Sequence, residues 1–244
     1  MYRKGMFRHL EVLTCASRTN RKAMTEWLLH EYSLGIRALP GLKDLRIYIT
    51  HEQSIFGPPF CDSFVECYFQ DRSALDKAAK TDTMTAHIEE LGRRGFVRGS
   101  NLQIVWAEEN IIEIPAGPRK MHGESGKFCQ MGTLRCSPGM SVTELRRWWL
   151  EEHAETGKHL LGLKWYTVLF PIRDTPWGPP PFDGYASVWY DSVSELKAAA
   201  ASKIMQGQMQ DVRRHNMDSP ELSKVVLADE HISAIELNTG EEDR

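Results

Sequence analysis

Long apolar runs are missing from this chain of 244 residues. No stretch approaches the roughly 20 apolar residues that a helix needs to cross a bilayer. The N-terminal Met-Tyr-Arg-Lys-Gly is not followed by the apolar segment of a secretory signal. The sequence therefore predicts a cytoplasmic protein with no membrane partner.

Cysteine is scarce and irregularly spaced. The five cysteines are odd in number and form no Cys-x-x-Cys pair, which argues against both a disulfide framework and a zinc site. The histidine motifs of metalloenzymes, phosphate-binding loops, dinucleotide fingerprints and nucleophile elbows are also absent. From these absences we expect no metal and no bound dinucleotide, unless the fold assembles a metal site from distant residues.

An excess of charge of one sign is lacking as well. The formal net charge is −3, with 26% charged and 41% hydrophobic residues. This balance is ordinary for a globular protein and provides no electrostatic surface for nucleic acid. We expect no nucleic-acid partner.

The chain does contain an internal repeat. Adding 121 to a position in the first half gives its counterpart in the second, without a gap from the first expected strand to the fourth. Triplets and single residues match in this register: Trp27 with Trp148, Gly41-Leu42-Lys43 with Gly162-Leu163-Lys164, Gly57-Pro58-Pro59 with Gly178-Pro179-Pro180, and Asp62 with Asp183. This register indicates tandem copies of one unit, at about residues 7–115 and 128–236.

Both copies are predicted to have the same order of elements, judged from periodicity and breakers. The first copy is expected to have strands at 7–15, at 42–50, from Asp62 and from Leu102, with helices that begin near Asn20 and Ser73. The resulting order β-α-β-β-α-β is that of a ferredoxin-like unit. One such unit leaves an apolar face of its sheet uncovered, so two units should pack sheet to sheet.

The predicted fold class is therefore α+β, with two tandem ferredoxin-like (βαββαβ) units packed as an intrachain dimeric α+β barrel. We place the first unit at 1–118, a linker at 119–126 and the second unit at 127–244, because the linker has the composition of a connecting segment. Fusion closes the barrel within one chain, so either a monomeric pseudo-dimer or a homodimer is expected.

A series of short motifs follows in order along the second copy. They are Trp149-Leu150-Glu151-Glu152-His153, Gly162-Leu163, Gly178-Pro179-Pro180-Pro181-Phe182-Asp183-Gly184 and Ser187-Val188-Trp189-Tyr190-Asp191-Ser192. In order and spacing these motifs resemble the EthD family of dimeric α+β barrels. The first copy departs from the pattern, with Tyr32 in place of His153 and Ser63 in place of Gly184. We therefore expect one working site or two different ones.

The resemblance implies small hydrophobic pockets beside the sheet. Such pockets are expected to work without metal or organic cofactor on aromatic, polyketide-like or lactone substrates. The chemistries that the wider superfamily implies are decarboxylation, dehydration or cyclisation, isomerisation and cofactor-free oxygenation. All of them can be driven by a general acid or base in a desolvated pocket.

Four residues are candidates for acid–base chemistry: His153, His9, Tyr32 and His51. His153 can take and give a proton near neutral pH, unless it only caps a helix or lies on the surface. Tyr32, at the matching position, could polarise a carbonyl oxygen or could be a core aromatic. His9 shares a strand face with Glu11, which indicates a pocket in the first copy. His51 lies on the second strand, on the face opposite Arg46.

Six residues are candidates for substrate binding: Arg46, Tyr48, Trp148, Tyr166, Trp177 and Asp183. Arg46 could hold a substrate carboxylate in a bidentate manner, or could be a solvated charge on a strand. The aromatic residues could line a pocket for a planar substrate, with Trp177 as its lid, or could fill the core. Asp183 alternatively caps the proline-rich turn that precedes it.

The function predicted from these features is that of a cofactor-independent lyase. It would use general acid–base chemistry to decarboxylate, dehydrate or rearrange a small aromatic or polyketide-like acid or lactone. The alternatives are a non-catalytic protein that binds hydrophobic ligands and a cofactor-free monooxygenase of aromatic substrates. Ionisable groups facing the cavity would favour an enzyme, an all-apolar lining would favour a carrier, and dependence on dioxygen would identify the monooxygenase.

Overall fold

A computed structural model describes residues 1–15, 20–115 and 128–232 of the chain. The elements of the first half are β1 (Tyr2–Leu13), α1 (Arg21–Trp27), η2 (Leu28–Tyr32), α2 (Ser33–Ile36), β2 (Leu42–Thr50), β3 (Ser63–Phe69), α3 (Arg72–Ala78), α4 (Asp82–Arg93) and β4 (Leu102–Ile112). Those of the second half are β5 (Phe128–Leu134), α5 (Val142–Trp148), η3 (Trp149–His153), α6 (Ala154–Gly157), β6 (Trp165–Pro171), β7 (Gly184–Tyr190), α7 (Val193–Ala200), α8 (Lys203–Arg214) and β8 (Ser223–Ile232).

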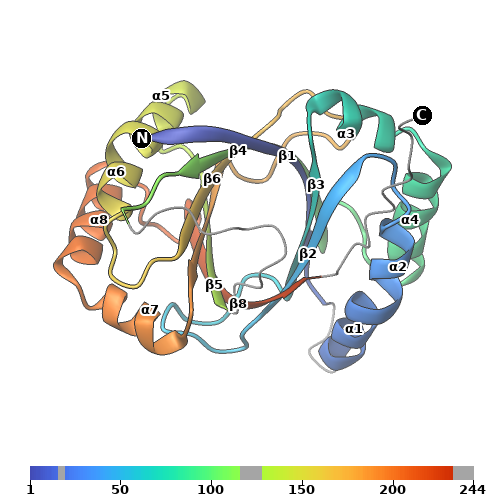
Figure 1. Cartoon of the computed structure of the whole chain (residues 1–244), viewed down its shortest axis with the longest axis horizontal. Coiled ribbons are helices and arrows are strands. Elements are labelled where there is room, and N and C mark those ends of the chain that lie inside the picture. The colour runs from blue at the N-terminus through green and yellow to red at the C-terminus, as the bar shows by residue number, and fades with distance from the viewer. Residues whose placement is uncertain (16–19, 116–127, 233–244) are drawn as a thin grey trace, which may run out of the picture.

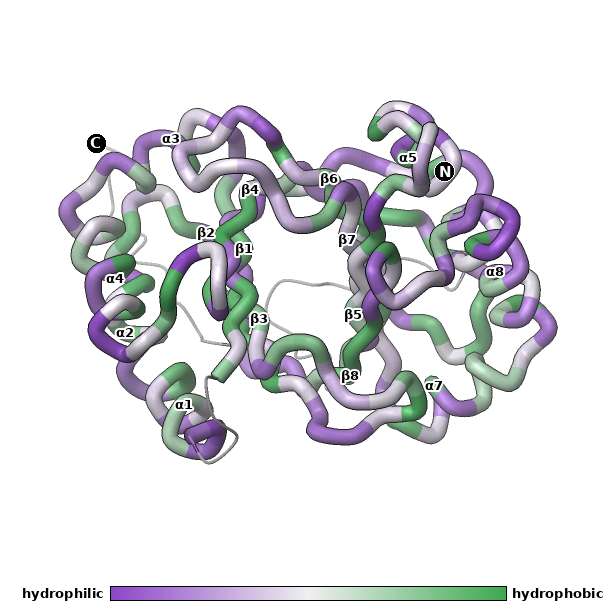
Figure 2. The backbone as a smooth tube through the Cα atoms, turned by 180° about the vertical axis from the view of Figure 1, so that it is seen from behind, coloured by the Kyte–Doolittle hydropathy of each residue, from purple (hydrophilic) through white to green (hydrophobic). Residues whose placement is uncertain are grey.

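The strands form one closed antiparallel barrel in the order β1-β3-β2-β8-β5-β7-β6-β4. Helices α1 to α4 cover one side of the barrel and α5 to α8 the other, as Figure 1 shows and Figure 2 shows from behind. The predicted α+β class and the barrel are therefore confirmed. The predicted linker, residues 119–126, lies outside the described residues.

The two halves meet along two antiparallel seams. Strand β2 pairs with β8, where Thr50 lies opposite Ala228, and β4 pairs with β6, where Ala107 lies opposite Pro171. These two pairs are related by the same shift of 121 residues that relates the halves of the sequence. The seams satisfy the edge strands of both halves, which would otherwise expose unpaired backbone groups.

Some element boundaries differ from the predicted ones. Strand β1 begins at Tyr2, because its first residues pair with the end of β4 beyond a break in register after Lys4. The single helix expected from Ser73 is two helices, α3 and α4. The Thr81 hydroxyl accepts the backbone N–H of Met84 at 3.2 Å, so a new helix begins there.

The first long helix of each half contains a π-helical turn at the same place. These turns, η2 and η3, end at Tyr32 and His153 respectively, which are counterparts in the repeat. A π-helical turn inside an α-helix is often found at a functional site. The position predicted to carry acid–base chemistry thus has an unusual backbone in both halves.

Strand side chains alternate between the barrel interior and the outer faces beneath the helices. Leu10 and Val12 belong to an interior cluster with Phe64, whereas His9 and Glu11 face the helices. This confirms the predicted alternation along β1. Within the described residues, no helix has the length and apolar character that crossing a membrane requires.

Candidate functional site

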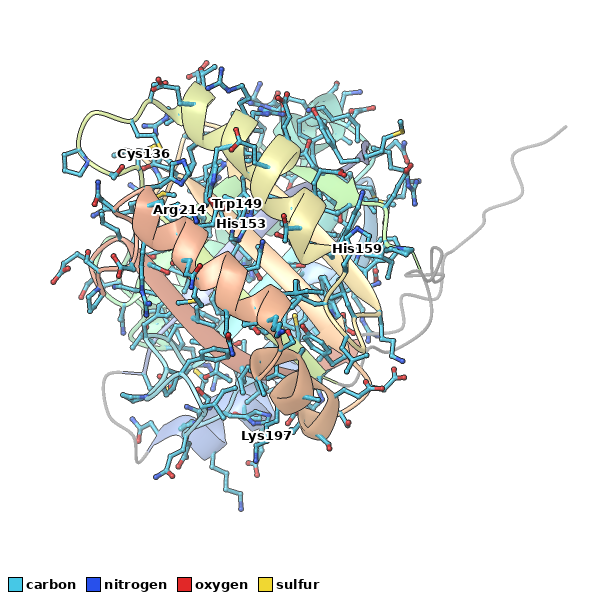
Figure 3. All side chains as sticks on the ribbon, turned by 90° about the vertical axis from the view of Figure 1, so that its left-hand side faces the viewer. Cys136, Trp149, His153, His159, Lys197 and Arg214 are labelled. Atoms are coloured by element: carbon cyan, nitrogen blue, oxygen red, sulfur yellow. The ribbon has the colours of Figure 1, made fainter. Side chains whose placement is uncertain are left out.

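A cavity of about 310 Å³ lies in the second half, between the outer face of the sheet and the helices. Its apolar walls include Leu134, Trp149, Leu160, Val188, Met205, Met209, Val212 and Val225, and its polar lining includes Gln130, His153, Tyr166, Gln208, Asp218 and Ser223. Figure 3 shows Trp149 and His153 beside each other, between the first helical segment of this half and α8. A mostly apolar pocket with a few convergent polar groups is typical of a small-molecule site.

His153 is the ionisable centre of this cavity. Its Nδ1 lies 3.0 Å from Oδ2 of Asp211 on α8, and the same carboxylate oxygen accepts the indole N–H of Trp148 at 3.1 Å. The hydrogen bond from His153 lowers the pKa of the Asp211 carboxyl, although partial burial acts in the opposite direction. Because the Asp211 carboxylate accepts a hydrogen bond from Nδ1–H, the lone pair of the neutral imidazole is on Nε2. His153 therefore has the orientation of a general base.

Tyr166 provides a hydroxyl group in the same cavity. Its oxygen accepts the indole N–H of Trp149 at 3.2 Å. Burial raises the pKa of Tyr166 to about 12, so the phenol keeps its proton at neutral pH. The O–H can therefore donate to the oxygen of a bound ligand.

Two residues of β5, Gly132 and Gln130, line this cavity. Gly132 has no side chain, and a Cβ placed there would have its nearest neighbours at 3.7 Å, the Lys224 carbonyl oxygen and Val225 Cγ2. The neighbouring Gln130 has a side-chain oxygen that is buried without a hydrogen-bond partner among the described residues. A ligand with a hydrogen-bond donor would satisfy this oxygen.

The corresponding region of the first half is filled by a buried polar cluster. Glu11 Oε1 lies 2.9 Å from His9 Nε2 and 2.8 Å from His87 Nε2, and Glu11 Oε2 accepts the Tyr32 hydroxyl at 2.7 Å. Trp106 donates its indole N–H to His9 Nδ1 at 3.1 Å. Burial acts to raise the pKa of Glu11, but His87 and His9 outweigh it and hold that pKa far below its usual range. Both ring nitrogens of His9 are thus engaged.

The proline-rich loops cross between the halves. Trp177, from the loop between β6 and β7, packs edge-on against His9 and Trp106, with ring centroids 5.9 and 6.4 Å away. Its counterpart Phe56, from the loop between β2 and β3, lines the cavity of the second half and is 37% exposed. Each loop therefore reaches the pocket region of the opposite half, and Trp177 covers the first-half cluster.

Arg46 and Tyr48, expected to bind substrate, face the interior of the barrel instead. Arg46 Nη1 donates to Glu230 Oε1 at 2.7 Å, and the Tyr48 hydroxyl donates to the same oxygen at 3.0 Å. A second buried ion pair, between Arg8 and Glu66 at 2.6 Å, lies on the same side of the sheet. The structure therefore does not bring Arg46 or Tyr48 to the cavity, because even positions of β2 face inward.

The other candidates lie at the edges of these sites or away from them. His51 Nε2 lies 3.1 Å from Asp229 Oδ1 at the β2–β8 seam. Trp148 packs against His153 with the ring centroids 4.7 Å apart and the rings tilted by 41°, and it is not part of the cavity lining. Asp183 accepts the Cys136 backbone N–H at 2.9 Å and pairs with Arg173 of the proline-rich loop, so it ties that loop to the segment after β5.

Sequence reasoning missed Asp211, Gln130 and Phe56. Asp211 follows Gln208 by three residues on α8, so both are on one helix face, and Gln208 donates to the His153 carbonyl at 2.9 Å. The three-residue spacing of Gln208 and Asp211 on a predicted helix was the sequence feature that could have indicated Asp211. Within the described residues, no group of three or more His, Cys, Asp or Glu side chains is arranged to hold a metal ion.

Comparison with known proteins finds a family match within the second half. Residues 137–219 match the family model of the EthD domain, and this segment is therefore similar to an EthD domain. The cavity beside His153 is called the EthD cavity. This result confirms the resemblance predicted from the motifs between Trp149 and Ser192. The EthD match includes His153 and Asp211, but it does not include β5 or β8.

Solved structures of similar fold cover nearly the whole chain. An anthrone oxidase-like protein has a TM-score of 0.64 at 10% identity, over 96% of this chain and 97% of its own. A candidate monooxygenase from Fusobacterium nucleatum has a TM-score of 0.56 at 12% identity, over 95% and 94%. A chlorite dismutase variant from Candidatus Nitrospira defluvii has a TM-score of 0.51 at 12% identity, over 95% and 92%. At such identities these likenesses show the fold alone, and no curated protein matches the chain in sequence.

Proposed function

We propose that the EthD cavity is the active site of a cofactor-independent enzyme. Its substrate would be a small aromatic or polyketide-like acid or lactone. The observation that carries this proposal is the His153–Asp211 pair, 3.0 Å apart, in an apolar cavity that Tyr166 also lines. A carrier of hydrophobic ligands would not need these ionisable groups, so the lining favours an enzyme.

The chemistry of these residues is proton transfer. His153 Nε2 takes a proton from the substrate, and Asp211 stabilises the imidazolium that forms. Tyr166 donates its hydroxyl to the carbonyl oxygen on which negative charge develops. Acid–base help of this kind is typically worth about 10² to 10⁴ in rate.

The first candidate reaction is that of a lyase or isomerase. The carbanion formed at the deprotonated position either forms a double bond and expels a hydroxyl group, which takes the proton back from the imidazolium of His153 and leaves as water, or is reprotonated elsewhere by His153. In a decarboxylation the carboxylate leaves as carbon dioxide, and the protonated imidazole supplies the proton that replaces it.

The second candidate is cofactor-free oxygenation. The solved structures of similar fold include an anthrone oxidase-like protein and a candidate monooxygenase, which favours this alternative. Here the deprotonated substrate is the reductant and dioxygen the oxidant, and the same proton abstraction by His153 comes first. Dependence on dioxygen separates the two reactions.

We also propose that the chain consists of two tandem ferredoxin-like units, 1–118 and 127–244, joined by 119–126. The support is the shared order of elements and the strand order within each half, β4-β1-β3-β2 and β8-β5-β7-β6. Only the second unit would be catalytic, because His9, Glu11 and Trp177 occupy the equivalent space in the first. A single chain completes the barrel, so activity would not require a second copy.

The test is turnover of a panel of aromatic acids, lactones and polycyclic phenols, followed by mass spectrometry in chelated buffer with and without dioxygen. We expect His153→Ala and Asp211→Asn to lower turnover by about 100-fold or more, and Tyr166→Phe by less. His159→Ala is the matched control, because His159 is exposed and lies outside the cavity lining. Turnover that survives His153→Ala but fails in His9→Ala would move the site to the first half. Ligand binding without turnover of any panel member would favour the carrier.

A further inference from the structure

A second cavity, of about 280 Å³, lies at one end of the barrel. It is formed where β1 and β5 end and where β4 and β8 begin, with Val12 and Phe182 of the barrel interior among its lining residues. It shares Thr133 with the EthD cavity, but it lies on the barrel side of β5 rather than beneath the helices. The proposed catalytic chemistry does not use this cavity.

Two cationic side chains line one wall of this barrel-end cavity. Lys224 on β8 lies opposite Thr133 of β5, and the backbone N–H of Arg135 bonds to the carbonyl of Leu222 at 2.7 Å. Arg135 and Lys224 are therefore diagonal neighbours across the two strands, on one face of the sheet. Such neighbours have Cα atoms about 7–8 Å apart, within reach of long side chains.

Among the described residues, neither Arg135 nor Lys224 forms a salt bridge with a carboxylate. Glu221 is the acidic residue of the lining; its carboxylate bonds to Ser219 and its own backbone and also interacts electrostatically with Lys224, so this single negative charge offsets only part of the two positive ones. Like charges placed together on a sheet repel each other, so an anion between them would be stabilising. An arginine also offers the planar fork that fits a carboxylate.

The rest of the cavity offers an apolar surface. Lys224 Nζ lies 5.5 Å from the centre of the Phe60 ring, so this cation is held against an aromatic wall. Val12 and Phe182 add buried apolar lining. In the register of the repeat, the counterparts of Arg135 and Lys224 are Thr14 and Gln103, which line the cavity without charge. The cavity thus lies between the two halves, with its positive charge in the second half alone.

We infer that the barrel-end cavity binds a small organic anion. Its carboxylate would lie between Arg135 and Lys224, and its flat apolar body against Phe60 and Phe182. The volume suits a single-ring carboxylate. This binding does not depend on the proposed catalysis, since none of the cavity's charged residues takes part in it.

Isothermal titration calorimetry with benzoate tests the inference, with benzamide as the uncharged ligand of similar shape. We expect Arg135→Gln and Lys224→Gln each to weaken benzoate binding by about tenfold or more, and benzamide to bind at least that much more weakly than benzoate to the wild type. Arg93→Gln, an exposed arginine on α4, should bind benzoate as the wild type does. Circular dichroism of each variant would verify its fold, which we expect to be intact because both cations are exposed.

Three outcomes would overturn the inference. Benzoate binding that is unchanged in both variants would assign it to another site, such as the EthD cavity. An equal loss in Arg93→Gln would indicate a general effect of net charge. The third outcome combines two results: inorganic phosphate displaces benzoate completely, and benzamide binds as tightly as benzoate. Together these results would show that the cavity does not recognise an organic carboxylate. None of these outcomes bears on whether His153→Ala abolishes turnover, so the two proposals fail separately.

Discussion

The histidines beside Glu11 and Asp211 differ in how many of their ring nitrogens are engaged. Glu11 engages both His9 and His87 inside the first-half core, where Glu11 itself is fully buried. Asp211 Oδ2 lies 3.0 Å from Nδ1 of His153, which is at the edge of a cavity, while Asp211 Oδ1 lies 3.6 Å from Nδ1 of His215. A histidine with one nitrogen held by a carboxylate and the other available is suited to proton transfer, whereas one with both nitrogens engaged is suited to stability.

The pH dependence of stability should reveal the Asp211 contact. The folded-state pKa of Asp211 is below its usual value, so its stabilisation is present above about pH 4 and is lost as the pH falls through the folded pKa. We expect Asp211→Asn to be less stable than wild type by about 1 kcal/mol or less near neutral pH, because the group is partly exposed. Urea unfolding at a series of pH values would show the two curves converging below about pH 4. Glu89→Gln, an exposed control, should parallel wild type, and a gap that does not narrow as the pH falls below about 4 would contradict this account.

Removal of Glu11 should damage the fold more than most core substitutions. Glu11→Ala leaves the buried donors of His9, His87 and Tyr32 without an acceptor, so we expect a loss of about 3–5 kcal/mol in the free energy of unfolding. Glu11→Gln keeps an oxygen acceptor and should lose less. The matched control is Gly132→Ala at the equivalent position, where a Cβ meets no atom closer than 3.7 Å. A Glu11→Ala protein as stable as Gly132→Ala would rule out the structural role.

At the scale of elements, the crossed loops make the halves unequal. The loop between β6 and β7 places Trp177 over the first-half cluster, while the loop between β2 and β3 places the smaller Phe56 at the edge of the open cavity. The larger ring closes one pocket region, and the smaller one leaves the other accessible. One loop therefore covers a buried cluster, and its counterpart borders an open cavity.

Truncating each loop aromatic should have different effects. Trp177→Ala should lower stability by about 1–3 kcal/mol, because the indole is half-buried against His9 and Trp106. It should also expose His9 to modification by diethyl pyrocarbonate, which mass spectrometry can measure at that residue. Phe56→Ala is the control: it should leave both stability and His9 reactivity nearly unchanged while altering ligand binding in the EthD cavity. Protection of His9 that survives Trp177→Ala would show that the loop is not its cover.

At the scale of the whole molecule, the closed barrel joins the halves by backbone hydrogen bonds. The β2–β8 and β4–β6 seams leave no free edge in the sheet. The buried pair Arg46–Glu230 also crosses between the halves, from β2 to β8. The halves therefore depend on each other for both their edges and their interior charges.

This dependence predicts the behaviour of the separated units. Fragments 1–118 and 127–244, each produced alone, should aggregate or self-associate, because each exposes two unpaired strand edges and unpaired buried charges. Produced together, they should form a one-to-one complex with the circular dichroism of the full chain, as size-exclusion chromatography would show. A stable, monomeric 127–244 fragment would contradict the prediction that the barrel needs both halves.

Much of the fold could be predicted from the sequence. Hydrophobic periodicity is a local pattern, and the repeat is a constant shift along the chain, so neither requires knowledge of distant contacts. The order of elements followed from breakers and apolar spacing, and the shift of 121 residues aligned the halves before any contact was known. The opposite faces of His9 and Leu10 followed from strand alternation. For the site, the importance of His153 came from its place in a family-like motif, and Tyr166 from aromatic content.

Contacts between distant segments could be decided only by the tertiary structure. Asp211 reaches His153 across 58 positions, and Arg46 meets Glu230 across 184, so no local pattern contains either pair. Which side of a strand faces the barrel and which faces the helices depends on how the sheet closes, and this excluded Arg46 from the cavity. The repeat register alone was enough to align the two halves and to predict their shared order of elements. Three-dimensional packing decided which half keeps a cavity beside the position of Glu11 or Gly132, because that depends on the volumes of these residues and of the crossed loops.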